Sequence, residues 1–163
     1  MYNHNLDPVA FTLFSFKIYW YSLSYLFGFL FSYFYAKYLI KEGYFKIQFS
    51  NFEDFLGWAV LGVVFGGRIG YVVFYNIDFY IQNPLDIIKI WKGGMSFHGG
   101  LLGLILTIIL YSRFKKINHL ELFNLVSTCS PFGLFLGRLA NFVNGELIGR
   151  PTNSGWGVLF EEN

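Results

Sequence analysis

The chain is short of charged residues. Of its 163 residues, 13% are Asp, Glu, Lys or Arg, whereas 55% are hydrophobic and 23% are aromatic. Soluble domains carry about twice that share of charge, so the composition indicates a membrane protein. The formal net charge of +2 is too small to indicate a nucleic-acid partner, and no basic run alternates with aromatic residues in a polar context.

Other absent residues and motifs exclude several kinds of site. The single cysteine, Cys129, excludes an internal disulfide and a cysteine-rich metal site. The sequence also lacks a Walker loop, a dinucleotide fingerprint, a His-Glu-x-x-His helix and an internal repeat, so we expect neither a metal nor a cofactor. Residues 1–17 lack the basic start of a removable signal peptide. The pair Asp7-Pro8 breaks any helix there, and we expect this segment to lie at the membrane interface.

The chain has four apolar segments, and three of them have lengths suited to crossing a bilayer at 1.5 Å per helical residue. We expect spans at Ile18 to Leu39, at Phe55 to about Phe74, at Leu101 to Tyr111 and at about Leu120 to Leu139. The third run is short, so this span must include the region of His98 to cross. The sequence therefore predicts an all-α, polytopic transmembrane helical bundle with about four spans. We expect one transmembrane domain over residues 1–163.

Basic residues predict the orientation of these spans. Lysines and arginines gather after the first and third spans, at Lys37, Lys41, Lys46, Arg113, Lys115 and Lys116. Loops rich in these residues stay in the cytoplasm, so the N-terminus is expected outside. On this topology Tyr21, Arg68, His98 and the end of the fourth span lie at similar depth on the outer side.

The stretch Gly137 to Arg150, directly after the fourth apolar run, is unusually polar. It contains Arg138, Asn141, Asn144, Glu146 and Arg150 within fourteen residues. Such groups are costly beside lipid unless they are paired, face a wet cavity or meet a ligand, so they indicate a functional site. Guanidinium groups beside side-chain amides favour an anion, most simply a phosphate.

Three further polar residues have alternative interpretations. The second apolar run is interrupted by Gly66-Gly67-Arg68-Ile69-Gly70, whose glycines permit close helix approach. Arg68 either snorkels to headgroups or makes a structural or substrate contact. His98, between two glycine pairs, is either a structural histidine or a base that takes a proton near neutral pH. Tyr21 either packs at the interface or belongs to the site. No serine or cysteine is paired with a base, so a nucleophile would come from a substrate.

Three motifs together resemble the bacterial prolipoprotein diacylglyceryl transferase family. They are Gly137 to Arg150, His98 within Gly94 to Leu101, and Gly66 to Tyr71 with Phe74-Tyr75-Asn76, in order along the chain. The resemblance implies an enzyme of the bacterial inner membrane. It would move the diacylglyceryl group of phosphatidylglycerol to the lipobox cysteine thiol of a preprolipoprotein, forming a thioether and releasing glycerol phosphate. That transfer is the first step of lipoprotein maturation.

The resemblance also implies roles for residues. Arg138 matches the arginine that binds the lipid phosphate, His98 the histidine proposed to deprotonate the thiol, and Tyr21 an essential tyrosine of the first span. The substrate-binding set would be Arg138, Asn141, Asn144, Glu146, Gly149 and Arg150, with Arg68 as a further contact. Glu146 or a water is the alternative to His98 as base.

Two departures from the family pattern are visible. Ala140 stands where the family usually has glycine, which adds a methyl group at a tight position. The family continues beyond the position of Asn163 through a periplasmic domain and further spans, so the resemblance implies a C-terminally truncated member.

Two alternative functions stay open: an inactive membrane protein that binds anionic phospholipid, and a small transporter component. The gathering of polar residues at one face argues against a conduction path.

Overall fold

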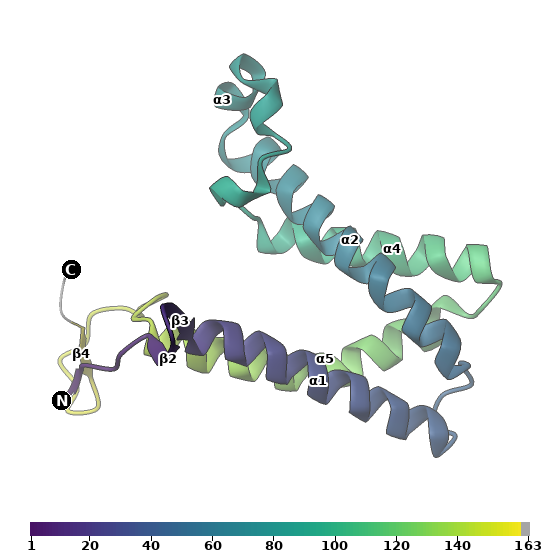
Figure 1. The fold of residues 1–163 in the computed structure, drawn as a ribbon, viewed down its shortest axis with the longest axis horizontal. Coiled ribbons are helices and arrows are strands. Elements are labelled where there is room, and N and C mark those ends of the chain that lie inside the picture. The colour runs from purple at the N-terminus through teal and green to yellow at the C-terminus, as the bar shows by residue number, and fades with distance from the viewer. Residues whose placement is uncertain (161–163) are drawn as a thin grey trace. The chain divides into compact units, whose positions relative to one another are not determined.

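The computed structural model describes residues 1–160, and four long helices dominate it (Figure 1). These are α1 (Trp20–Lys41), α2 (Phe49–Tyr75), α4 (Phe97–Lys115) and α5 (His119–Val143). Each is long and apolar enough to cross a membrane. The predicted all-α polytopic fold with four spans is therefore confirmed.

Short elements lie between and around these helices. The strands are β1 (Tyr2–His4), β2 (Val9–Leu13), β3 (Phe16–Tyr19) and β4 (Val158–Phe160), and the short helices are α3 (Ile77–Gln82), η1 (Pro84–Asp86) and η2 (Ile90–Lys92). The N-terminal segment contains no helix, as Asp7-Pro8 predicted. It forms a β2–β3 hairpin, and β1 pairs in parallel with β4.

Two predicted boundaries were wrong. Helix α2 begins at Phe49, before the predicted start at Phe55, and it runs without a break through the glycines around Arg68. Those glycines are tolerated because they let a second helix approach closely. Helix α5 continues to Val143, past the predicted end at Leu139, so the first half of the polar stretch is helical. Pro131 lies inside α5, and the helix extends on both sides of it.

The chain forms two compact units. One comprises Met1–Tyr38 together with the chain from Ser127 onward, and the other comprises Leu39–Val126. Each unit has its own helix pair, α1 with α5 in the first and α2 with α4 in the second. The prediction of one transmembrane domain over the whole chain stays a prediction.

In the second unit, α2 and α4 meet along facing rows of small residues. The rows are Gly62, Gly66 and Gly70 on α2, and Gly99, Gly103 and Thr107 on α4, each with a spacing of four. A Cβ atom on Gly103 would lie 2.1 Å from the carbonyl oxygen of Gly62, and one on Gly66 would lie 2.4 Å from that of Gly99. The two backbones are therefore in direct contact, which only glycine permits at these positions.

We expect Gly103→Ala to destabilise this helix pair by about 1–3 kcal/mol, because the added methyl group meets rigid backbone. The free energy of unfolding in a detergent titration measures the effect. Gly57→Ala, on a part of α2 where a Cβ atom has no neighbour within 4 Å, is the control. It should be neutral or slightly stabilising, since alanine favours a helix. Equal destabilisation by both variants would contradict this packing.

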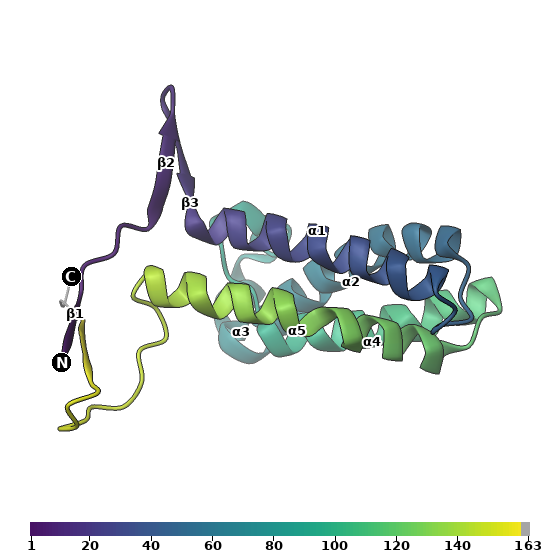
Figure 2. The same ribbon diagram turned by 90° about the horizontal axis from the view of Figure 1, so that it is seen from below.

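In the first unit, α1 and α5 lie side by side (Figure 2). A Cβ atom on Gly28 would lie 3.0 Å from the Cα atom of Gly133, and the Ser32 hydroxyl donates a 3.0 Å hydrogen bond to the Cys129 carbonyl. This pairing places the beginning of α1 beside the end of α5. The polar stretch that begins at the end of α5 thus lies near Tyr21.

Candidate functional site

The polar stretch turns sharply at the end of α5. Gly145 has φ +67°, a left-handed conformation that favours glycine. Its N–H donates to the Phe142 carbonyl, and the N–H of Glu146 donates to the Asn141 carbonyl. These two bonds form a Schellman motif, which satisfies the last carbonyls of the helix. Arg138 and Asn141 lie three residues apart on the last turns of α5 and therefore share one face of the helix.

Beyond this turn the chain encloses a pocket of about 370 Å³. Its lining combines polar groups with a wall of apolar side chains. The lining residues are Arg138, Asn141, Phe142, Glu146, Leu147, Ile148, Gly149, Arg150, Thr152, Trp156, Gly157, Val158 and Phe160. The structure therefore gathers five of the predicted substrate-binding residues, namely Arg138, Asn141, Glu146, Gly149 and Arg150, in one pocket.

The two arginines supply the positive charge of the pocket. Both are exposed, and within residues 1–160 neither forms an ion pair. The C-terminal end of α5 carries the partial negative charge of the helix dipole, so the helix itself disfavours an anion there. Any phosphate bound here must depend on the guanidinium groups, which match its oxygen geometry in a bidentate manner.

Asn144 lies beside the pocket and does not line it. Its Nδ2 donates to Glu146 Oε1 at 3.3 Å, while its Oδ1 is buried and has no hydrogen-bond partner among the described residues. Asn144 thus orients the Glu146 carboxylate and keeps one acceptor free. Gly149 has open space around it, because a Cβ atom added there would have no neighbour within 4 Å. Packing against neighbouring atoms therefore gives no reason for a glycine at position 149.

The far wall of the pocket depends on the N-terminus of the chain. Strand β1 pairs with β4, whose Val158 and Phe160 line the pocket. The His4 ring packs between Phe142 and Phe160, with centroid distances of 5.3 and 4.8 Å, and its Nε2 bonds the Phe142 carbonyl at 2.6 Å. Sequence reasoning missed His4, because no local pattern links it to a strand more than 150 residues away.

Tyr21 lies in the first turn of α1, close enough to Arg138 and Glu146 to interact electrostatically with both. Its hydroxyl is 3.4 Å from the hydroxyl of Tyr25. The structure therefore places this predicted residue in the same unit as the pocket and near its charged groups.

His98 belongs to the second unit, in the first turn of α4. Its side chain is exposed and lies edge-on to the Phe97 ring at 5.6 Å between centroids. The turn is well defined: the Ser96 hydroxyl accepts from the Gly99 N–H at 3.2 Å, and the Ser96 N–H donates to the Gly67 carbonyl at 2.9 Å. His98 is thus held on a capped helix start with its ring accessible, as a proton acceptor would need to be.

Arg68 is buried, with 4% of its surface exposed, and does not snorkel. Its guanidinium has five N–H donors, and all five meet backbone carbonyls of the loop between α3 and α4. The accepting carbonyls are those of Asp86, Ile87, Lys89, Gly93 and Gly94, at 2.5 to 3.4 Å. The guanidinium also lies 5.2 Å from the centre of the Tyr80 ring. This geometry favours the structural interpretation of Arg68; its role in substrate binding stays a prediction.

A cluster of charges reinforces the same loop. The Asp86 carboxylate accepts hydrogen bonds from the ammonium groups of Lys89 and Lys92. Those bonds hold the pKa of Asp86 below its ordinary value. Since this pKa is lowered on folding, the pairing stabilises the loop above the ordinary pKa of an aspartate, and the stabilisation is lost as the pH falls through the lowered value.

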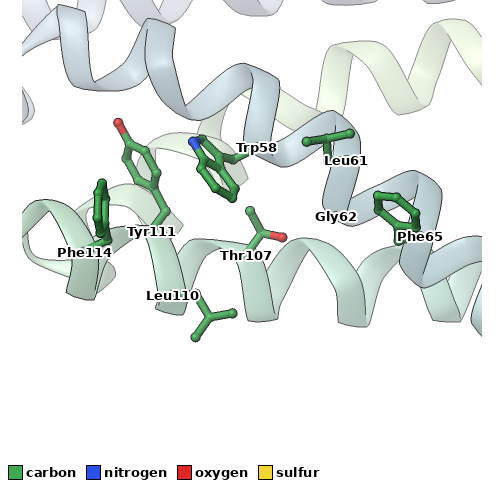
Figure 3. Close-up of a pocket in the computed structure, with 8 residues that line it drawn as sticks. All are labelled: Trp58, Leu61, Gly62, Phe65, Thr107, Leu110, Tyr111 and Phe114. Atoms are coloured by element: carbon green, nitrogen blue, oxygen red, sulfur yellow. The ribbon is translucent and has the colours of Figure 1, made fainter.

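A second hollow, of about 430 Å³, lies between α2 and α4 (Figure 3). Trp58, Phe65 and Phe114 give it an apolar lining, and its two hydroxyl groups are already bonded. Thr107 Oγ1 donates to the Gly103 carbonyl at 2.8 Å, and the Tyr111 hydroxyl donates to the Asn51 carbonyl at 2.6 Å. None of its eight lining residues is charged, so this hollow is unsuited to holding a phosphate, and the candidate site is the pocket at the end of α5.

Comparison with known proteins tests the resemblance directly. The family model described as prolipoprotein diacylglyceryl transferase matches residues 8–163. The chain belongs to the prolipoprotein diacylglyceryl transferase family. It is 50% identical over 156 residues to the phosphatidylglycerol–prolipoprotein diacylglyceryl transferase of Rickettsia canadensis, an alignment covering 96% of this chain and 60% of that protein. The protein of the same name from Azospirillum brasilense is 48% identical over 156 residues, covering 95% of this chain and 58% of that protein.

The diacylglyceryl transferase relatives are longer than this chain, which spans about 60% of the length of the first of them. The match nevertheless includes all the motifs that carried the resemblance, since residues 8–163 contain Tyr21, Arg68, His98 and the stretch 137–150. Ala140, the departure from the family pattern, is buried, with 3% of its surface exposed.

The turn at Gly145 gives a testable link between the sequence of this family member and its pocket. We expect Gly145→Ala to lower the free energy of unfolding by about 1–2 kcal/mol, because a Cβ atom is disfavoured at positive φ. Its space is not crowded, as the nearest side-chain atom to a Cβ would be 3.7 Å away. Gly149→Ala, at ordinary φ with open surroundings, should leave stability unchanged in the same denaturation experiment. Equal stability of the two variants would contradict the role of the turn.

Proposed function

We propose that the pocket at the end of α5 binds the headgroup of phosphatidylglycerol and that the chain serves the transfer of its diacylglyceryl group to the lipobox cysteine of a preprolipoprotein. The observation that carries this proposal is the convergence of Arg138 and Arg150 with Asn141 and Glu146 in one pocket with an apolar wall. The names of the relatives support the same reaction, since both are phosphatidylglycerol–prolipoprotein diacylglyceryl transferases.

The pocket suits an amphipathic phosphodiester. The two guanidinium groups match the phosphate oxygens, while the Asn141 amide and the Glu146 carboxylate provide partners for glycerol hydroxyls. The apolar side chains of Leu147, Ile148 and other lining residues cover the lipid side. Phosphatidylglycerol combines these features, because its phosphate is esterified on one side to a polar glycerol and on the other to diacylglycerol.

In the proposed reaction the cysteine thiol loses its proton, and the thiolate attacks the glyceryl carbon that bears the phosphate ester. A carbon–sulfur bond forms, the carbon–oxygen bond breaks, and glycerol phosphate leaves with the bonding electron pair. Negative charge therefore grows on the phosphate oxygen that leaves. Arginines that hold this phosphate stabilise the transition state more than the ground state.

The proton of the thiol needs an acceptor. We propose His98 for this role because its ring is accessible and its residue type titrates near neutral pH; Glu146 or a water is the alternative. Tyr21, near Arg138 and Glu146, is proposed to act with them at the phosphate. The remaining residues of the predicted set, Gly149 among them, line or support the pocket.

We propose that the enzyme works in the bacterial inner membrane, with the pocket toward the periplasm. The support for this orientation is the basic character of the loops after the first and third spans. Lys41 ends α1 and Lys46 lies in the loop after it, while Arg113 and Lys115 lie in the last turn of α4 and Lys116 follows it. Such residues keep their loops in the cytoplasm, so the opposite helix ends, with Tyr21 and Arg138, face outward.

A transfer assay tests this proposal. The purified chain in micelles that contain phosphatidylglycerol is mixed with a lipobox peptide carrying a free thiol, and mass spectrometry measures the added diacylglyceryl group. We expect the mass shift with phosphatidylglycerol and none with phosphatidylcholine. No shift from a folded chain that retains phosphatidylglycerol would contradict transfer and favour the alternative function, an inactive protein that binds anionic phospholipid. The transporter alternative has no support from the pocket, which lies at one end of a helix pair.

A further inference from the structure

The hairpin that precedes α1 has one apolar and one polar face. In its register Phe11 is opposite Ile18, Leu13 is opposite Phe16, and Thr12 is opposite Lys17. Residues directly opposite each other in an antiparallel pair point to the same face, and the face alternates along each strand. One face therefore carries four apolar side chains, and the other carries Thr12 and Lys17.

The apolar face is open. Phe11, Leu13 and Phe16 are 52%, 56% and 76% exposed. Isolated exposed apolar residues are ordinary, but a contiguous group of this kind on one face marks a contact surface. An isolated two-stranded hairpin is also marginally stable at best in water, so this one needs a partner for its apolar face.

The tip of the hairpin also indicates an apolar partner. Phe14 is 93% exposed and has φ +53°, a conformation that costs a non-glycine residue about 1–2 kcal/mol. Glycine is the residue favoured at such a turn position. A phenylalanine ring placed there, outside the strands and away from the rest of the chain, is suited to entering an apolar medium.

The position of the hairpin brings it to the membrane surface. Strand β3 ends at Tyr19 and α1 begins at Trp20 with no residue between them, and the Trp20 N–H donates to the Pro8 carbonyl at 3.0 Å. Tyrosine and tryptophan at the end of a span are typical of the interface. Figure 2 shows β2 and β3 projecting sideways from the start of α1. A hairpin that extends across the axis of a membrane-spanning helix at its end lies along the bilayer surface.

We propose that the β2–β3 hairpin is seated on the lipid bilayer, with Phe11, Leu13, Phe16 and the Phe14 ring in the interfacial layer and with Thr12 and Lys17 facing water. The hairpin is thus a lateral anchor that fixes the depth of the first turn of α1, and with it the depth of Tyr21. This inference does not depend on the proposed reaction, because it concerns only the contact of the hairpin with lipid.

Spin-label accessibility, measured on the full chain in bilayers of phosphatidylcholine and phosphatidylglycerol, tests whether the hairpin is seated on lipid. Single cysteines at positions 11, 12, 13, 16 and 17, in a Cys129→Ser background, carry the nitroxide label. We expect labels at 11, 13 and 16 to collide mainly with oxygen, which partitions into lipid, and labels at 12 and 17 to collide mainly with a water-soluble nickel chelate. The accessibility should alternate with a period of two residues.

Two results would overturn the inference. Equal nickel accessibility at all five positions would place the hairpin in water, and protection of positions 11, 13 and 16 from both reagents would mean that protein covers this face. A second variant, Phe14→Gly, removes the ring without endangering the fold, because glycine adopts a positive φ without strain. With this variant the strand pattern should persist, but the oxygen accessibility of labels at 13 and 16 should fall severalfold. Unchanged values would contradict insertion of the tip.

Discussion

Arg138→Gln should lower the rate of diacylglyceryl transfer by about 10²-fold or more, because it removes a cation from the phosphate on which charge develops. Arg138 lines the pocket and forms no ion pair among residues 1–160, so its replacement disturbs no salt bridge of the fold. The transfer assay with mass spectrometry, run at several phosphatidylglycerol concentrations, measures kcat and KM separately.

The pattern of the two kinetic constants identifies the role of Arg138. A residue that acts mainly in the transition state lowers kcat, whereas one that only binds the headgroup raises KM. We expect a fall in kcat, with Arg138→Lys intermediate because lysine keeps the charge and loses the planar fork. Arg113→Gln, an exposed arginine at the end of α4, is the matched control and should leave both constants unchanged. Similar losses from both arginine substitutions would contradict a specific role for Arg138.

Arg68→Lys should open the loop between α3 and α4. Lysine has three donors, whereas the Arg68 guanidinium makes five hydrogen bonds to backbone carbonyls, so at least two of these bonds are lost. A hydrogen bond to a charged group contributes about 1.5–3 kcal/mol, which predicts a loss of about 3–6 kcal/mol in the stability of the loop. Hydrogen exchange over residues 83–96 measures it, and we expect much faster exchange than in the unaltered chain.

The same experiment separates the two interpretations of Arg68. If the guanidinium holds the loop, exchange rises over residues 83–96 and the position of His98 at the start of α4 is lost with it. If Arg68 binds the substrate, Arg68→Lys leaves exchange unchanged and weakens the binding of phosphatidylglycerol. Arg113→Lys should affect neither quantity.

The sequence was sufficient to predict the membrane-spanning helices, because the hydrophobicity that indicates them is a local property of each segment. Long apolar runs predicted three of the four helices, and the fourth, α4, was predicted once the region of His98 was added to its short run. The motifs and their order along the chain were also sufficient to predict the family. The differences concern helix ends: α2 begins at Phe49, before the predicted Phe55, and α5 continues to Val143, past the predicted Leu139. The glycines around Arg68 were predicted to permit close helix approach, and Gly66 and Gly70 do face a second helix.

The wall of the pocket could not be predicted, because it depends on pairing between distant segments. Strand β1 at residues 2–4 and strand β4 at residues 158–160 are each three residues long and have no pattern that identifies the other. The five-carbonyl contact of Arg68 was also beyond prediction, since backbone acceptors leave no trace in the sequence. Residue types indicated a phosphate; only the structure gathers Arg138, Glu146 and Arg150 in one pocket.

Native mass spectrometry of the bound lipid tests the central claim most directly. The chain is released from micelles that contain equal amounts of phosphatidylglycerol and phosphatidylcholine, and the retained lipid is weighed. We predict that one phosphatidylglycerol is retained in preference, that Arg138→Gln abolishes this preference, and that Arg113→Gln keeps it. Equal retention of both lipids, or a preference that survives Arg138→Gln and Arg150→Gln together, would contradict a headgroup site at the end of α5.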